Sequence, residues 1–530
     1  MRKILMLVAL LAMTAPVCAQ SHFLRGDTNN DGGVDIGDAL YLLSNLFAGG
    51  PDPICNDSAD ANDDGGKDIG DAVYLLTFLF QGGAAPEAPY PNWELDPTPD
   101  SIDCKGTVVI HSGMIAADET WSSTETHVLS GQVEVPAGVT LTIEAGTTVL
   151  GESATNGFLL VNQGVLIANG TALAPIVFTS ENPVGSRSTA DWGGVLIIGS
   201  GRNNWPDGIG QTEGVVAPYG TQGAACGGTT GTPCAFDETT SNGSMRYVRI
   251  EFGGTDISPN NEVNALSMFS VNDTTTFEFI QVKQNLDDGF EWFGGTASLK
   301  YGLATGIGDD KFDYSFGWAG KGQFWVGHDY DNFTIAGKPD NGFEVDNRED
   351  AAEYEFEPVT NPEISNVTMI GDPTGDSDHA FNFRRGAAGT VINAYAEGWT
   401  DSILDIDDVA TTTAGSGGEL ISFSNNVAFN NASPNLWDLD GDEEPFSEDL
   451  WFLNGNMEAG MSQVVQANAD LGAGQVPNFR PVAGGMLVGT ATDPAAFFGG
   501  SFFDSVDYIG GVAPTGSDWT QASWVSYQVD

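Results

Sequence analysis

The chain has 530 residues, with 73 acidic against 18 basic side chains and a formal net charge of −55. A surface of this charge repels nucleic acid and anionic membranes and favours cations, so neither of the first two is an expected partner. The length allows more than one domain, and the 69 glycines accompany many aromatic residues, which indicates tight turns and repeats in place of disorder.

Residues 1–19 are typical of a secretory signal peptide. Arg2 and Lys3 precede an apolar stretch from Ile4 to Met13, and Val17-Cys18-Ala19 provides small residues for cleavage. No later apolar run is long enough to span a bilayer, so we expect no transmembrane segment. The sequence therefore predicts a secreted protein, either extracellular or at the cell surface.

Four cysteines remain after cleavage of the signal, and export permits disulfides. Cys226 and Cys234 bracket a loop rich in glycine and threonine, which favours a pair between them. Cys55 and Cys104 would then form the second pair. Four cysteines allow three connectivities, so these pairs are predictions from spacing alone.

Two twelve-residue loops, 27–38 and 60–71, have nearly the same sequence and lie 33 residues apart. Each carries oxygen-bearing side chains at loop positions 1, 3, 5, 9 and 12 and glycine at position 6, the spacing that calcium requires. A single such loop could be a turn rich in Asp and Asn, but two matched loops disfavour that alternative. The expected ligands are the side chains of Asp27, Asn29, Asp31, Asp35 and Asp38 with the Gly33 carbonyl, and those of Asp60, Asn62, Asp64, Asp68 and Asp71 with the Gly66 carbonyl.

An apolar helical segment follows each loop, at 39–47 and 72–80, and a Gly-Gly pair ends each one. Residues 22–83 thereby resemble the type I dockerin, a duplicated calcium-binding EF-hand module of secreted polysaccharide-degrading enzymes. The resemblance implies a domain at 20–83 that docks onto a cohesin-like protein. In that family loop positions 10 and 11 set specificity, often with hydroxyl residues, whereas here they are Ile36-Gly37 and Ile69-Gly70. A self-contained surface-attachment module is the alternative.

Residues 84–105 are rich in proline and acidic residues, which indicates an extended linker. Short strands separated by glycine turns follow, at 133–136, 141–147, 164–168, 174–180, 191–197 and 245–252. These segments resemble secreted bacterial right-handed parallel β-helix proteins of the pectin-lyase-like class. We expect a mainly β chain with a β-helix at 106–485, a loop inserted at 202–242 that projects from it, and a C-terminal cap over the last coil at 486–530.

One hexad recurs five times between Asp287 and Asp407. It reads Asp, two variable residues, an apolar residue, a polar or acidic residue and an apolar residue, and its copies begin 22, 31, 38 and 23 residues apart. Alternation indicates a half-buried strand, and recurrence at this spacing indicates a solenoid. We predict that the copies stack as equivalent strands, with an outward row Glu291, Asp313, Glu344, Asn382, Asp405 and a second outward row Phe293, Ser315, Asp346, Arg384, Asp407.

The acidic rows support two functions. As an enzyme, the protein would be a calcium-dependent polysaccharide lyase or glycoside hydrolase acting on an acidic glycan, with further calcium sites on the β-helix. Arg384 or Arg385 would then be the base, acids such as Asp405 and Asp313 would bind metal or move protons, and exposed tryptophans would line a sugar groove. These tryptophans are Trp292, Trp318, Trp325 and Trp399.

The sequence contains no catalytic signature of a lyase or hydrolase family, and fold alone does not give activity. The first residue of each hexad is more typical of a side chain that caps a turn by accepting hydrogen bonds from backbone amides, repeated as a ladder from coil to coil. These residues are Asp287, Asp309, Asp340, Asp378 and Asp401. His379 and His328 have no recognisable partner Ser or Cys, and Arg384 is more typical of an ion pair than of a base. The favoured interpretation is a calcium-binding protein whose β-helix binds extracellular or cell-envelope polysaccharide and whose N-terminal module attaches it to a partner or surface.

Overall fold

A computed structural model describes most of the chain as two compact units. One holds the described residues up to Val109 with Thr124–Thr126, and the other holds Ile110–Ser123 and His127–Asp530. The predicted signal peptide and three of the four cysteines lie outside the described residues. Those residues are 23–48, 50, 53, 55–92, 97–98, 108–182, 184–215, 217–220, 236–256, 263–330, 340–375, 377–407, 411, 421–429, 432, 436, 455–467, 469, 471 and 474–530.

The N-terminal unit is helical, as predicted from its duplicated sequence. It contains α1 (Ile36–Ala48), α2 (Asn56–Ala59) and α3 (Ile69–Gln81). Asp68 and Asp71 form a capping box at the start of α3, and Gly82 ends that helix in the left-handed conformation. None of the described helices of the chain is both long and apolar enough to cross a membrane.

The first part of the expected linker packs on the helical unit. The Arg25 guanidinium donates to the carbonyl of Ala88 at 2.8 Å, the amide of Glu87 donates to the carbonyl of Ala61, and Phe78 meets Tyr90 edge to face. Residues 84–92 therefore belong to the unit, because side-chain, backbone and aromatic contacts all tie them to it.

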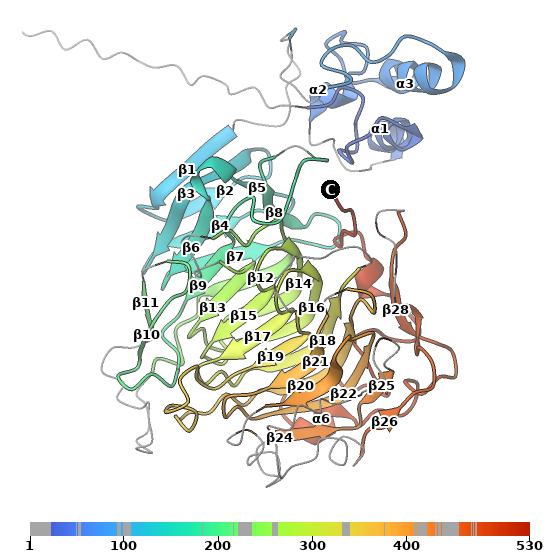
Figure 1. The fold of residues 1–530 in the computed structure, drawn as a ribbon. Coiled ribbons are helices and arrows are strands. Elements are labelled where there is room, and N and C mark those ends of the chain that lie inside the picture. The colour runs from blue at the N-terminus through green and yellow to red at the C-terminus, as the bar shows by residue number, and fades with distance from the viewer. Residues whose placement is uncertain are drawn as a thin grey trace, which may run out of the picture. The chain divides into compact units, whose positions relative to one another are not determined.

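The second unit is a parallel β-helix, which confirms the predicted fold class. Among the described residues one sheet of 24 strands joins parallel neighbours into three walls (Figure 1). The first wall contains β2 (Glu119–Trp121), β4 (Thr140–Ile143), β7 (Val165–Asn169), the first halves of β12 (Gly243–Glu251), β14 (Thr276–Asn285), β16 (Ser298–Ile307), β18 (Lys321–His328), β20 (Glu363–Ile370) and β22 (Gly389–Glu397), and β24 (Ile421–Ser424).

The other two walls complete each coil. The second contains β5 (Thr148–Gly151), β8 (Ile176–Ser180), the second halves of the six long strands, β25 (Val427–Phe429) and β26 (Met457–Glu458). The third follows β1 (Val108–Met114) and contains β3 (Thr126–Pro136), β6 (Phe158–Asn162), β9 (Val195–Ile198), β13 (Leu266–Phe269), β15 (Phe290–Phe293), β17 (Phe312–Ser315), β19 (Phe343–Val345), β21 (His379–Phe383) and β23 (Ser402–Ile406).

The corner between the first and second walls needs one residue per coil with a positive φ. Asparagine adopts this conformation at low cost, whereas aromatic residues do not. The aromatic rings recover part of that cost because they stack coil on coil, with centroids 4.2–4.9 Å apart. The residues, with φ from 49° to 62°, are Tyr247, Phe279, Tyr301, Phe324, Asn366, Asn393 and Asn425.

The five hexads stack in register on the third wall, as predicted. Inside the coil they form two buried columns, Phe290, Phe312, Phe343, Phe381, Leu404 and Trp292, Tyr314, Val345, Phe383, Ile406. The tryptophans considered for a sugar groove, Trp292, Trp318, Trp325 and Trp399, are fully buried. They are core residues, and the hypothesis that they bind sugar is wrong.

The insert at 202–242 packs on the third wall, so the expectation of a projecting loop is wrong for its described part. This part includes β10 (Ile209–Gln211) and β11 (Pro218–Gly220). Trp205 stacks on Phe316, and Tyr219 lies against Phe269. The outward side chains of the early coils, such as Leu160 and Leu196, are apolar here. The insert packs on them and removes their surface from water.

The C-terminal segment runs back along the second wall, whereas we expected a cap over the last coil. Its apolar side chains cover outward residues of that wall such as Leu303, Val326 and Ile370. Three side-chain amides hold it, and each both donates to and accepts from one backbone residue at 2.7–3.0 Å. The pairs are Asn393 with Thr492, Gln323 with Asp504, and Gln281 with Ser526.

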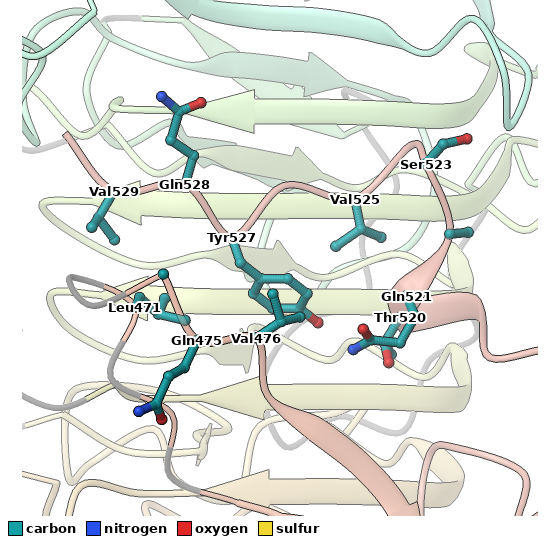
Figure 2. A pocket seen from close by; sticks show the side chains of 12 residues that line it. Leu471, Gln475, Val476, Thr520, Gln521, Ser523, Val525, Tyr527, Gln528 and Val529 are labelled. Carbon is teal, nitrogen blue, oxygen red and sulfur yellow. The ribbon is translucent and has the colours of Figure 1, made fainter. Parts of the chain in front are cut away.

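A pocket opens between this segment and residues 471 and 474–476 (Figure 2). Tyr527 lies at its centre, and Gln475, Gln521 and Gln528 are among its lining side chains. None of the described lining residues carries a charge, in contrast to the acidic composition of the chain.

We expect Gln323→Ala to loosen the C-terminal segment. The Gln323 side chain is fully buried, and its loss removes both hydrogen bonds to the backbone of Asp504 and a third to Asn366. The free energy of unfolding should fall by about 2 kcal/mol, with faster hydrogen exchange at 500–508. Gln132→Ala is the control, because that exposed side chain should contribute less than about 0.5 kcal/mol. Equal effects of the two substitutions would contradict the role of the amide.

Candidate metal sites and the acidic wall

The two N-terminal loops have the same hydrogen-bond pattern. In the first loop the Asp27 carboxylate accepts from the amides of Asp31 and Gly32, and Asp38 accepts from the amide of Asp35. In the second, Asp60 and Asp71 accept the equivalent bonds. These bonds turn each loop sharply and orient the carboxylates at loop positions 1 and 12.

Carboxylates at loop positions 1, 5 and 12 repel one another in both loops. Burial raises the pKa of Asp27 to about 7, and the negative charges of Asp38 and Asp31 add to this effect. Burial also raises the pKa of Asp38 to about 6. Burial and then Asp60 raise the pKa of Asp71 to about 7. Buried acids that repel one another need a proton or a cation. The oxygen donors and Asx turns fit calcium, with the ligands named above and the carbonyls of Gly33 and Gly66.

Calcium binding to these loops should weaken strongly in acid. A carboxyl whose pKa rises from 3.8 to about 7 stabilises the metal-free fold below pH 4 and loses that contribution as the pH rises toward 7. Calcium needs the deprotonated form, so its affinity should fall at least about a hundredfold between pH 7.5 and pH 5. Calorimetric titration in buffers of different ionisation enthalpy measures both the affinity and the protons released. An affinity independent of pH would contradict this expectation.

The acidic wall is the outward face of β15, β17, β19, β21 and β23. Its residues lie in the predicted register, Glu291, Asp313, Glu344, Asn382, Asp405, on neighbouring strands. Adjacent strands are about 4.8 Å apart, so Asp313 and Asp405 are separated by about 14 Å. That separation exceeds the spacing of a paired acid and nucleophile in glycoside hydrolases.

A ladder of side-chain oxygens does cap the strand starts, but it runs one residue later than predicted. The amide of Asp288 donates to Asn264, that of Asp310 to Asp288 at 2.9 Å, and that of Asn341 to Asp310 at 2.8 Å. The first-position residue Asp340 instead pairs with Lys311, whose ammonium lies 2.7 Å from it and 2.9 Å from Asp329. The Lys311 side chain is fully buried. Burial alone would lower the pKa of Lys311, but the two carboxylates outweigh it and raise the pKa.

Arg384 is an ion-pairing residue in the structure. Its guanidinium contacts Glu344 and lies 2.9 Å from Asp346, which Arg385 also contacts at 2.6 Å. Burial and then the neighbouring Arg385 lower the pKa of Arg384. Arg384, Asp313 and Asp405 thus share one face, but Arg384 is paired with other acids and the three are not assembled as a catalytic set.

The structure gives His379 a serine partner that we did not predict. His379 and Ser402 lie side by side on β21 and β23, and their Nδ1 and Oγ atoms are 2.9 Å apart. The Nε2 atom is 4.0 Å from Asp405 and from Asp401. Ser402 is fully buried and donates to the carbonyl of Leu404, so it cannot attack an extended glycan. Only the parallel register, one coil apart, could have indicated this pair from sequence.

Three stacked walls of parallel strands with a ladder of side-chain oxygens define a parallel β-helix protein. The model of the family "pectate-lyase like beta helix domain" matches residues 113–457, and the chain belongs to this family. No curated protein and no solved structure gives a significant match.

Proposed function

We propose that the protein is an exported calcium-binding protein whose β-helix binds extracellular or cell-envelope polysaccharide and whose N-terminal unit attaches it to a partner or surface. Membership of the pectate-lyase-like family carries the polysaccharide assignment. The paired loops carry the calcium assignment, because two equal sets of oxygen donors repeat the same backbone bonds.

Matched apolar stripes support docking by the dockerin-like N-terminal unit. On α1 the exposed side chains are Ile36, Leu40 and Phe47, with 48–68% of their surface accessible. On α3 they are Ile69, Val73 and Phe80, with 53–65% accessible, at the same helical spacing. Two like stripes, each at positions i, i+4 and i+11, form the type of surface that a protein partner covers. A cohesin-like protein remains the proposed partner.

The binding proposal has a direct test. Affinity electrophoresis on a panel of neutral and acidic polysaccharides, with calcium and with chelator, should show retarded migration of the full chain on at least one polymer. Phe47→Asp with Phe80→Asp leaves the β-helix intact and should not change this retardation. Absence of retardation on every polymer, for chain shown to be folded, would refute polysaccharide binding.

The second candidate is a calcium-dependent lyase or hydrolase for acidic glycans. The high pKa of Asp313, raised by burial and by Asp310 and Asp346, is the observation in its favour, because a protonated acid can donate to a leaving group. Ultraviolet absorbance of unsaturated uronate and reducing-end release report turnover. Product that disappears in Asp313→Asn, Arg384→Ala or Asp405→Ala would favour the enzyme, and binding without product would favour the adhesive protein.

A further inference from the structure

Lys311 places a buried amine between two buried carboxyl groups. Its Nζ atom lies 2.7 Å from Asp340 Oδ1 and 2.9 Å from Asp329 Oδ2. The side chain of Lys311 is 0% exposed, that of Asp329 2% and that of Asp340 12%. A single carbon–oxygen bond separates Oδ1 from the Cγ atom of Asp340, so the amine reaches that carbon without any rearrangement of the backbone.

The surroundings of the amine exclude water. The Lys311 ammonium lies 5.6 Å from the centre of the Trp399 ring, and that ring is fully buried. Gly327 lies against the aliphatic stem of the lysine, where a Cβ atom would come within 3.2 Å of Lys311 Cγ. Charges without solvent are costly, so a reaction that converts these groups into neutral ones is favoured here.

The two carboxyl groups differ in a way that divides two chemical roles between them. Ser377 Oγ donates a hydrogen bond to Asp329 Oδ2 at 2.8 Å, which fixes the orientation of that carboxylate. Burial, and then the negative charge of Asp329, raise the pKa of Asp340 well above its usual range. Asp340 therefore holds a proton at neutral pH, and an amine attacks a protonated carboxyl far more readily than a carboxylate.

We propose that Lys311 and Asp340 condense to an intramolecular isopeptide bond, with Asp329 as the group that moves the protons. The Lys311 ammonium first gives a proton to the Asp329 carboxylate, and the lone pair of Nζ then attacks Cγ of Asp340. Asp329 gives its proton to the departing hydroxyl and takes one from Nζ. A Cγ–Nζ bond forms, one Cγ–O bond breaks, one water leaves, and Asp329 ends protonated.

Positioning drives this reaction. The ammonium is the resting form of Lys311, so the bond forms slowly and once, after the coils have folded. Groups held in contact react as if present at an effective concentration of about 10⁵ M or more. The amide product also removes the charges of Lys311 and Asp329 from the protein interior.

The bond would join consecutive coils of the β-helix. Lys311 directly precedes β17 and Asp340 lies shortly before β19, and these two strands are neighbours in the third wall. The cross-link depends neither on calcium nor on polysaccharide binding, so it is tested separately from the proposed function.

Mass spectrometry of the denatured full chain tests this proposal. The wild-type chain should be lighter than its mature sequence by the mass of one water. Trypsin does not cleave after an acylated lysine, and Lys338 precedes a proline. The digest should therefore contain residues 301–321 joined to residues 322–348, again lighter by one water.

Asp329→Asn removes the proton carrier but keeps both reacting groups, so this variant should have its full mass and be cleaved after Lys311. Lys300→Met is the matched control. Lys300 pairs with Asp504 at 3.1 Å, but the Asp504 side chain is 54% exposed. The control should retain the loss of water, and no wild-type peptide should join these two residues.

A folded wild-type chain of full mass that trypsin cleaves after Lys311 would overturn the proposal. So would a loss of water that persists in Asp329→Asn or maps to another pair of residues. The joined peptide is measured on the wild type itself, so it decides the question even if Asp329→Asn fails to fold.

Discussion

We expect chelation of calcium to unfold the N-terminal unit while the β-helix keeps its structure. The unit has little core: its two clusters contain Ala39, Ala61 and Leu75, and Leu42, Ala59 and Ala72. One ion bound at a hundredfold excess over its dissociation constant contributes about 2.7 kcal/mol, so two contribute about 5 kcal/mol, comparable to the whole stability of a small domain. Metal-free carboxylates with pKa values near 7 oppose folding further at neutral pH.

Hydrogen exchange resolved by peptide measures this effect in the full chain. Peptides from α1 and α3 should lose protection in chelator, and peptides from β14 and β16 should keep theirs. Asp60→Ala should reproduce the loss in calcium, whereas Glu87→Gln, an exposed acid outside both loops, should not. Full protection of both helices in chelator would show that packing alone holds the unit.

Lys311→Met should be among the most destabilising single substitutions in the β-helix. It leaves Asp329 and Asp340 buried without their ammonium, and an unpaired buried charge costs about 3–5 kcal/mol. The Lys311 ammonium also lies 5.6 Å from the centre of the Trp399 ring, a contact that methionine retains only as packing. Chemical denaturation at pH 7 measures the loss.

Lys321→Met is the matched control for this substitution. Lys321 pairs with Glu363 at 3.4 Å, but both side chains are about 40% exposed, at 39% and 41%. An exposed pair contributes less than about 1 kcal/mol, so the control should lose little stability. Similar losses for the two lysines would mean that the Lys311 pairs do not stabilise the core.

The register of the third wall could be predicted from sequence because strand periodicity is strict. In each hexad the two apolar residues flank a single polar one, so Phe312 and Tyr314 must face inward when Asp313 faces outward. The duplicated loop spacing likewise predicted α1 and α3 of the N-terminal unit, because glycine and capping residues mark where α3 begins and ends.

Long-range contacts of irregular segments were not predictable in the same way. The loop around Trp205 has no periodicity that indicates it covers Phe316, and Gln281 carries no local signal for its bonds to Ser526. The oxygen ladder was placed one residue early because Asp287 and Asp288 are both aspartates, and only backbone geometry distinguishes them. Ser402 meets His379 because both hold the second position of their hexads, so the predicted register implied the pair, although the histidine-serine bond itself was not predicted.

The returning C-terminal segment has a consequence for biogenesis. Gln281 on β14 is bonded to Ser526, 245 residues later, and Gly185 is bonded to Asp530, 345 residues later. A chain synthesised from its amino end can wind its coils in order, but the outward side of the middle coils stays bare until the final stretch has emerged. Truncation by a few dozen residues at the carboxyl end would therefore expose apolar side chains of the middle coils, such as Leu303 and Val326, to which other unfinished chains can adhere.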